Sequence, residues 1–123
     1  MPAIRYLVRD TDRAVKFYTE SLGFDLAEQW GPAFAIVRKD GIDLWLSGPQ
    51  TSAARPMPDG RVPEPGGWNR IVVEVSDLPG LVSHLKSQGA TVRNEIITGP
   101  GGSQVLIEDG EGNIVELFEP RGA

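Results

Sequence analysis

The sequence predicts an α+β domain of two βαβββ modules in tandem, and two observations lead to this fold class. First, the chain repeats itself, because Val8-Arg9-Asp10 matches Val75-Ser76-Asp77 and Ser21-Leu22-Gly23 matches Ser87-Gln88-Gly89. Second, each copy opens with an apolar, β-branched run, continues with a helical pattern and ends with three strand-like runs. The 123 residues suit a single domain. We expect module one at 1–47, a linker at 48–67 and module two at 68–123.

The expected strands are short apolar runs bounded by turn residues. They cover residues 3–8, 24–29, 33–38 and 42–46 in the first module, and 71–75, 91–97, 104–108 and 113–118 in the second. Gly, Pro, Asn and Asp interrupt strands and favour turns. We therefore expect turns at Gly31-Pro32, Asp40-Gly41, Gly99–Gly102 and Asp109–Gly112.

The two expected helices follow one plan. The first has Asp10 or Thr11 as its N-cap and the second has Asp77, side chains that accept hydrogen bonds from the first turn. Each helix then carries apolar residues at spacings of three and four, which indicates one buried side. Gly23 and Gly89 stand where a helix ends in the left-handed conformation.

The expected linker, residues 48–67, is rich in Pro, Gly and Ser and has no apolar period. Connections longer than about 12–15 residues within a compact domain are usually functional or disordered. We therefore leave two interpretations open, a partly ordered cover over a binding site and a disordered connection. Arg55 and Arg61 either contact an anionic ligand or are solvated linker charges.

Composition excludes several classes of function. The net charge of −5 leaves no excess of Lys and Arg to neutralise phosphates, so neither nucleic-acid nor anionic-membrane binding is expected. The absence of cysteine removes disulfides, thiolate nucleophiles and thiolate metal sites, and is typical of a reducing compartment. Charges at positions 5, 9, 10 and 12 fit neither a signal peptide nor a membrane span of about 20 apolar residues. We expect a cytoplasmic protein.

Three motifs resemble the vicinal oxygen chelate superfamily, which includes glyoxalase I, extradiol dioxygenases, fosfomycin-resistance transferases and bleomycin-resistance proteins. They are Val8-x-Asp10-x-x-x-Ala14-Val15-x-Phe17-Tyr18, Leu22-Gly23-Phe24 and the run from Asp109 to Leu117 (DGEGNIVEL). The resemblance covers nearly the whole chain except the linker. It implies two modules whose curved sheets enclose a cavity, often within a dimer.

Metal-dependent members of this superfamily carry ligands at four equivalent positions, near the start of the first strand and on the last strand of each module. In this chain the positions fall on Ala3, Trp45, Arg70 and Glu116. A divalent cation needs several oxygen or nitrogen donors, and only Glu116 supplies one. The lone histidine, His84, lies beside the apolar stripe of the second helix, where a structural role is favoured. We therefore expect no metal cofactor, with a divalent metal as the alternative.

The interior implied by the resemblance is aromatic. Trp45 stands at a metal-equivalent position, and Trp30, Phe34 and Trp68 lie at strand ends or beside the linker. Such flat apolar side chains form walls for planar ligands, although each one alone is more often a core residue. The combination favours a binding site.

Two arginines add positive charge to this expected site. Arg5 lies on the same face of its strand as Ala3, because side chains alternate along a strand. Arg70 occupies a metal-equivalent position. A guanidinium binds carboxylate and phosphate groups through a planar pair of hydrogen bonds. We therefore expect a ligand that is aromatic or anionic.

Arg70 and Glu116 allow more than one interpretation. They can form a hydrogen-bonded ion pair if they meet across the cavity, because buried charges must be paired, or they can contact the ligand. Glu116 could also act as a general base, but a nearby Arg70 would favour the ionised carboxylate and weaken that role.

Two functions of different classes remain. The first is a metal-free protein that binds a small, aromatic or anionic molecule, in the manner of the bleomycin-resistance branch. The second is a lyase, isomerase or dioxygenase that uses Glu116 as a metal ligand or as a base. The resemblance also implies a homodimer, and both a cavity within one chain and a cavity across the dimer fit the pattern.

Overall fold

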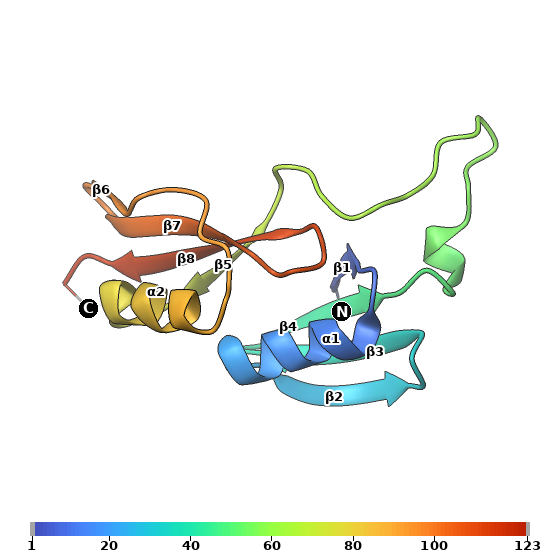
Figure 1. The fold of residues 1–123 in the computed structure, drawn as a ribbon, viewed down its shortest axis with the longest axis horizontal. Helices are drawn as coiled ribbons and strands as arrows, with labels where there is room; N and C mark the ends of the chain where they lie inside the picture. Colours follow the sequence, from blue (N-terminus) through green and yellow to red (C-terminus); the bar gives the residue numbers. More distant parts are fainter. Residues whose placement is uncertain (1, 123) are drawn as a thin grey trace. The chain divides into compact units, whose positions relative to one another are not determined.

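The computed structural model describes residues 2–122, which divide into two compact units. Unit 1 contains the chain up to Gly66 together with Glu111–Asn113, and unit 2 contains Gly67–Gly110 and the segment that starts at Ile114. Each unit has the βαβββ order expected from the sequence repeat (Figure 1). None of the helices that the structure describes has the length and apolar character needed to traverse a bilayer.

Unit 1 is a four-stranded mixed sheet in the order β1-β4-β3-β2 with one helix against it. Strand β1 is parallel to β4, and the other neighbours are antiparallel. The elements are β1 (Ile4–Leu7), α1 (Thr11–Lys16), η1 (Phe17–Ser21), β2 (Asp25–Trp30), β3 (Phe34–Lys39) and β4 (Ile42–Ser47).

The first helix begins as predicted and ends differently. Asp10 is its N-cap and accepts a hydrogen bond from the Arg13 amide at 3.1 Å. The sequence predicts one regular helix as far as Leu22, but α1 widens into the π-helical turn η1. There the Thr19 hydroxyl donates to the carbonyl of Val15 at 2.7 Å. Such a side-chain bond competes with the regular backbone ladder, which explains the wider turn.

The sheet of unit 1 buries one face against α1 and leaves the other face open. Because side chains alternate along strands, every second residue of β3 and β4 joins the core with the apolar side of the helix. The fully or largely buried apolar residues are Tyr6, Val8, Ala14, Tyr18, Leu22, Phe24, Ala35, Val37, Leu44 and Leu46. The residues between them lie on the open face, and these carry the candidate site.

A loop from the C-terminal half of the chain completes unit 1. The side chain of Glu111 is fully buried, and its Oε1 accepts hydrogen bonds from the amides of Arg9 (2.9 Å) and Asp10 (2.7 Å). Its Oε2 forms an ion pair with Arg13. The side-chain amide of Asn113 donates to the carbonyl of Leu7 at 2.7 Å. The turn between β1 and α1 is therefore held by residues more than one hundred positions away.

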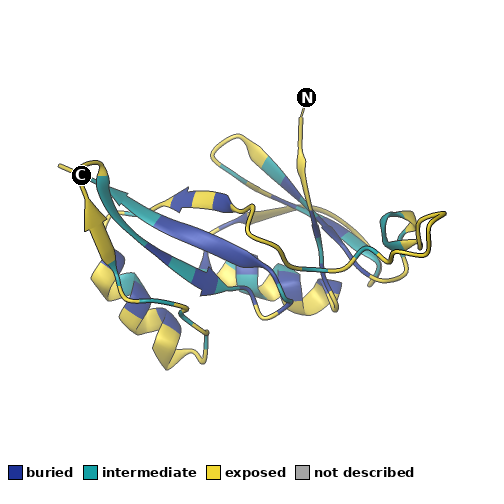
Figure 2. Ribbon diagram, turned by 90° about the horizontal axis from the view of Figure 1, so that it is seen from above, coloured by how far each residue is buried: buried dark blue, intermediate teal, exposed yellow. Residues whose placement is uncertain are grey.

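Unit 2 repeats the plan with the sheet order β5-β8-β7-β6. Strand β5 is parallel to β8, and α2 packs with Leu78, Val82 and Leu85 buried. Figure 2 shows this helix with buried residues along one side and exposed residues elsewhere. The elements are β5 (Ile71–Glu74), α2 (Leu78–Ser87), β6 (Ile97–Gly99), β7 (Gly102–Glu108) and β8 (Ile114–Pro120).

The strand predicted at residues 91–97 is wrong for most of its length. Only Ile97 lies in β6, and Val92 forms an isolated bridge with Ile107. The side chain of Asn94 accepts the amide hydrogen of Leu106 at 2.9 Å, in place of a backbone carbonyl. A side chain that takes over a ladder bond interrupts regular pairing.

The linker contains one short 3₁₀ turn, η2 (Ser52–Ala54), and otherwise neither helix nor strand in the described chain. Most of its residues after Ala54 are exposed. Arg61 forms an ion pair at 2.8 Å with Asp59, also in the linker, and 85% of the Arg61 side chain is exposed. This arrangement favours a solvated linker charge for Arg61.

Candidate functional site

The open face of the first sheet brings four predicted site residues together. The strand register places Arg5 of β1 beside Trp45 of β4, and Trp45 beside Ile36 of β3. At the sheet edge, Trp30 of β2 pairs with Phe34 of β3. Because all five side chains fall on the same face, residues from four strands form one surface.

A pocket of about 510 Å³ lies on this face. Its volume is within the range of small-molecule sites, which is about 300–1,000 Å³. It is lined by Arg5, Trp30, Ala33, Phe34, Ile36, Trp45, Thr51 and Ser52.

Three aromatic rings form a continuous wall of the pocket. The ring centroids of Trp30 and Phe34 are 6.0 Å apart, and those of Phe34 and Trp45 are 5.8 Å apart, both in edge-to-face arrangements. Trp30 is 68% exposed, although its indole is one of the largest apolar groups in the chain. Edge-to-face packing fixes the orientation of each ring and leaves ring faces available for a planar ligand.

Arg5 is the one charged residue in the lining. Its guanidinium lies over the Trp45 ring, 5.1 Å from the centroid, and its Nη1 donates to the Ser47 hydroxyl at 3.2 Å. Among residues 2–122, no carboxylate lies within ion-pair distance of Arg5. The pocket therefore combines apolar walls with one positive charge.

The start of the linker forms the rim of the same pocket. The Gly48 amide donates to the Ala33 carbonyl at 2.8 Å, and the Thr51 hydroxyl donates back to the Gly48 carbonyl at 2.7 Å. A side chain at Gly48 would collide with Thr11, because a Cβ there would lie 2.6 Å from the Thr11 hydroxyl. Close packing thus holds Thr51 and Ser52 against the pocket.

Arg38 and Asp43 pair farther along the open face of the first sheet. The Arg38 Nη2 donates to Asp43 Oδ2 at 3.0 Å, and Nε donates to Oδ1. The hydrogen bond from Arg38 lowers the pKa of Asp43 from its ordinary value. This arginine is therefore neutralised within the protein, unlike Arg5.

The other three predicted site residues belong to unit 2. Arg70 donates from Nε (3.1 Å) and Nη2 (2.9 Å) to Oε1 of Glu116, and from Nη1 to the Trp68 carbonyl (3.2 Å). The ion pair exists, and it joins the residue just before β5 to β8, the parallel neighbour of β5. The positive charge of Arg70 is thereby compensated.

Trp68 lies in a second arginine–tryptophan pair. The guanidinium of Arg93 is 5.7 Å from its ring centroid, and Arg93 Nε donates to Glu108 at 2.9 Å. Trp68 is 70% exposed. Each unit therefore has an arginine over a tryptophan, but the arginine of unit 2 is neutralised by a carboxylate.

The four metal-equivalent positions supply a single carboxylate between them, that of Glu116. No group of three or more His, Cys, Asp or Glu side chains is close enough to share an ion in the part of the chain that the structure describes. Ala3 offers no donor, Trp45 packs against Phe34 and Arg5, and Glu116 accepts two hydrogen bonds from Arg70. His84 is exposed on α2. A cation with several oxygen or nitrogen ligands does not fit this set of residues.

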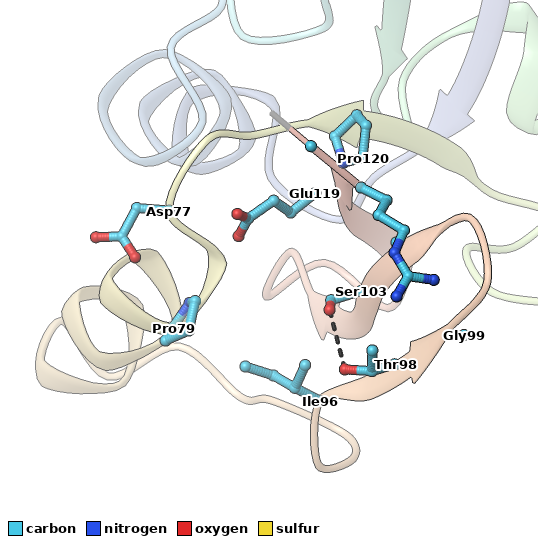
Figure 3. Close-up of a pocket in the computed structure, with 11 residues that line it drawn as sticks. Asp77, Pro79, Ile96, Thr98, Gly99, Ser103, Glu119 and Pro120 are labelled. Carbon is cyan, nitrogen blue, oxygen red and sulfur yellow. Dashed lines mark hydrogen bonds between the residues drawn. The ribbon is translucent and has the colours of Figure 1, made fainter.

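A second hollow, of about 520 Å³, lies in unit 2 beside the first turn of α2 (Figure 3). Glu119 faces it, and Oε1 of this residue accepts the Leu78 amide at 2.8 Å. On the opposite side, the hydroxyls of Thr98 and Ser103 hydrogen-bond to each other at 3.0 Å. These polar groups are already paired, and none of the predicted ligand-binding residues is among the described residues that line the hollow.

Sequence reasoning missed the polar and aliphatic parts of the first pocket. Ile36 lies two residues after Phe34 in the same strand, so alternation could have placed it on the same face. Ser47, Thr51 and Ser52 lie at a strand end and in the linker, where no periodic pattern marks their direction. Their contribution depends on how the chain turns after β4.

Solved structures of other proteins resemble the whole chain. Lactoylglutathione lyase from Agrobacterium tumefaciens is 20% identical, with a TM-score of 0.72 over 97% of this chain and 92% of that one. A glyoxalase/bleomycin resistance protein/dioxygenase superfamily member from Sphaerobacter thermophilus is 25% identical, with a TM-score of 0.71 over 97% of both chains. TnmS3, an antibiotic binding protein from a Streptomyces species, is 24% identical, with a TM-score of 0.66 over 98% of this chain and 96% of that one.

These likenesses agree with the βαβββ architecture of both units. The family described as the Glyoxalase/Bleomycin resistance protein/Dioxygenase superfamily matches residues 1–117, which include nearly all of the elements of the fold. The chain belongs to the glyoxalase/bleomycin resistance protein/dioxygenase superfamily.

Proposed function

We propose that the protein binds a small aromatic or anionic organic molecule in the pocket on the open face of the first sheet, without a metal ion. The observation that carries the proposal is the pocket lining itself, three linked aromatic rings beside one arginine that has no carboxylate partner among the described residues. Apolar walls with a few oriented polar groups are the usual composition of a ligand site.

The antibiotic-binding relative TnmS3 supports a binding role, because it shares the fold over nearly the whole chain. A relative named as a lyase shares the fold as well, so the fold alone does not choose between binding and catalysis. The side chains favour binding, because the described residues of the pocket lining include two hydroxyl groups but no carboxylate, imidazole or thiol.

The alternative is a metal-dependent lyase, isomerase or dioxygenase that uses Glu116. Its weakness is the bond between Glu116 and Arg70, which places a guanidinium where a metal or a substrate proton would have to lie. A homodimer, implied by the family resemblance, remains part of the proposal and is tested by analytical ultracentrifugation.

The test compares Trp45→Ala with the matched variant Trp68→Ala by isothermal titration calorimetry against a panel of aromatic acids and neutral aromatics. We expect Trp45→Ala to weaken binding roughly 10-fold or more, because a well-packed aromatic anchor contributes at least about 1.4 kcal/mol. Trp68→Ala should change the affinity less than threefold. Elemental analysis of the same protein accompanies the titration.

Stoichiometric zinc, nickel, iron or manganese, lost together with an activity in Glu116→Ala, would refute the binding proposal. Equal losses in Trp45→Ala and Trp68→Ala would refute the choice of pocket.

A further inference from the structure

Arg5 differs from most arginines of this protein in having no carboxylate partner among the described residues. Ion pairs at 2.9 Å or less neutralise Arg38, Arg61, Arg70 and Arg93, and Arg13 is paired with the buried Glu111. Arg9, Arg55 and Arg121 also have no carboxylate within ion-pair distance among the described residues, but none of them lines the aromatic pocket. The pocket therefore carries a positive charge in a protein whose net charge is negative.

The guanidinium of Arg5 is also held in one orientation. The Trp45 ring lies against it, and the Ser47 hydroxyl accepts a hydrogen bond from Nη1. Ser47 is fully buried at the end of β4, so its position is set by the sheet. A guanidinium has five N–H donors, and a planar group restrained in this way loses little entropy when it binds a carboxylate.

We infer that the ligand is a planar aromatic monocarboxylate, with its carboxylate on Arg5 and its ring against Phe34 and Trp30. This inference rests on the proposed function and narrows it to one class of molecule. A single negative charge is specified because Arg5 is the only charged residue among the described residues that line the pocket. Arg70, the second predicted anion-binding residue, is neutralised by Glu116 and adds no free charge.

The experiment uses four probes with the same ring system, namely naphthoate, naphthamide, naphthyl phosphate and naphthylmethylamine, titrated calorimetrically into the full-length protein. Naphthoate and naphthamide have nearly the same shape and differ in charge. We expect naphthoate to bind roughly 10-fold to 100-fold more tightly than naphthamide, as a hydrogen-bonded charge pair would produce. Naphthylmethylamine should bind more weakly than the amide.

The variant Arg5→Gln should abolish the preference for naphthoate while leaving the affinity for naphthamide within about threefold. Arg5→Lys retains the charge but not the planar fork, so it should recover only part of the preference. Arg55→Gln, which removes an exposed linker arginine, is the matched control and should leave the preference unchanged. Arg5 is exposed on a sheet edge, so Arg5→Gln should retain the far-ultraviolet circular dichroism of the parent.

Three results would overturn the inference, and they differ in what they say of the proposed function. Equal binding of naphthoate and naphthamide would refute the carboxylate class but retain the pocket. Tighter binding of naphthyl phosphate than of naphthoate would replace the monocarboxylate by a phosphate monoester. Failure of all four probes to bind would refute the inference together with an aromatic ligand for this pocket.

Discussion

The two units are built on the same plan and differ in how their arginines are partnered. In unit 1, Arg5 lies over Trp45 and has a hydroxyl as its polar partner. In unit 2, Arg70 gives two hydrogen bonds to Glu116, and Arg93 is paired with Glu108. Unit 1 therefore presents an arginine without a carboxylate partner beside aromatic rings, whereas Arg70 and Arg93 of unit 2 are each paired with a glutamate. The repeat preserves the order of helices and strands, while the charged side chains of the two units are partnered differently.

The first unit also requires a segment from the later part of the chain, Glu111–Asn113. Unit 1 depends on Glu111 from the loop before β8, which binds two backbone amides and Arg13. We expect Glu111→Ala to lower the free energy of unfolding by about 3 kcal/mol, since each buried donor without a partner costs about 1–3 kcal/mol. Chemical denaturation measures this change.

The matched control for that variant is Glu108→Ala, because Glu108 is also an acidic partner of an arginine, but its side chain is 36% exposed. Partly exposed pairs contribute about 0–1 kcal/mol. If both variants lose the same stability, the Glu111 loop is not essential to unit 1.

We expect the ion pair between Arg70 and Glu116 to affect the stability of the protein more than its affinity for a ligand. Arg70→Gln leaves the buried Glu116 carboxylate without its two hydrogen bonds, and we expect a loss of about 2 kcal/mol in denaturation experiments. Ligand affinity at the unit 1 pocket should stay within about threefold, as the separation of roles predicts. A selective loss of binding without a loss of stability would mean that Arg70 belongs to the binding site.

Ser47 should have a smaller effect, confined to the charged ligand. Ser47→Ala removes the hydroxyl that orients Arg5 and retains the volume of the buried site almost completely. We expect naphthoate to bind about threefold to fivefold more weakly and naphthamide to be unaffected, because one hydrogen bond contributes about 1 kcal/mol. Equal effects on both probes would indicate a general disturbance of β4.

The smallest expected effect concerns Arg38, the paired arginine on the same face as Arg5. Because Arg38 lowers the pKa of Asp43, the pair stabilises the folded protein above the unfolded pKa of Asp43. This contribution is lost as the pH falls through the lower, folded pKa. The stabilities of the parent and Arg38→Gln should therefore differ slightly near neutral pH and converge in acid. The affinity for naphthoate should be the same in Arg38→Gln as in the parent. If Arg38→Gln lost as much naphthoate affinity as Arg5→Gln, the presence of a carboxylate partner would not explain why only one of the two arginines binds the ligand.

Much of the fold could be predicted from the sequence, because it depends on local rules. The N-caps Asp10 and Asp77 place the starts of both helices correctly, and Gly23 and Gly89 have the predicted left-handed conformation, although α1 gives way to the π-helical turn η1. The irregular structure of the segment at 91–97 could not be predicted, because the bond from the Leu106 amide of β7 to the Asn94 side chain leaves no periodic trace in the sequence.

The aromatic members of the candidate site were also predicted from the sequence, because the resemblance implies that Trp45 occupies a metal-equivalent position. Alternation then places Arg5 on the same face of its strand as Ala3, another such position. The partners of the charged residues could not be predicted from the sequence. That Arg70 is neutralised within its own sheet and Arg5 is not depends on strand order and register.

The sequence by itself determined the duplicated βαβββ plan, because periodicity depends on residues and their spacing alone. The resemblance to the superfamily then implied metal-equivalent positions, three of which hold Ala3, Trp45 and Arg70 in this chain. Only the tertiary structure decided which charges remain uncompensated and that Glu111 supports the opposite half of the chain. Ion pairing depends on distances of a few ångströms between residues remote in sequence, and only the folded chain sets those distances.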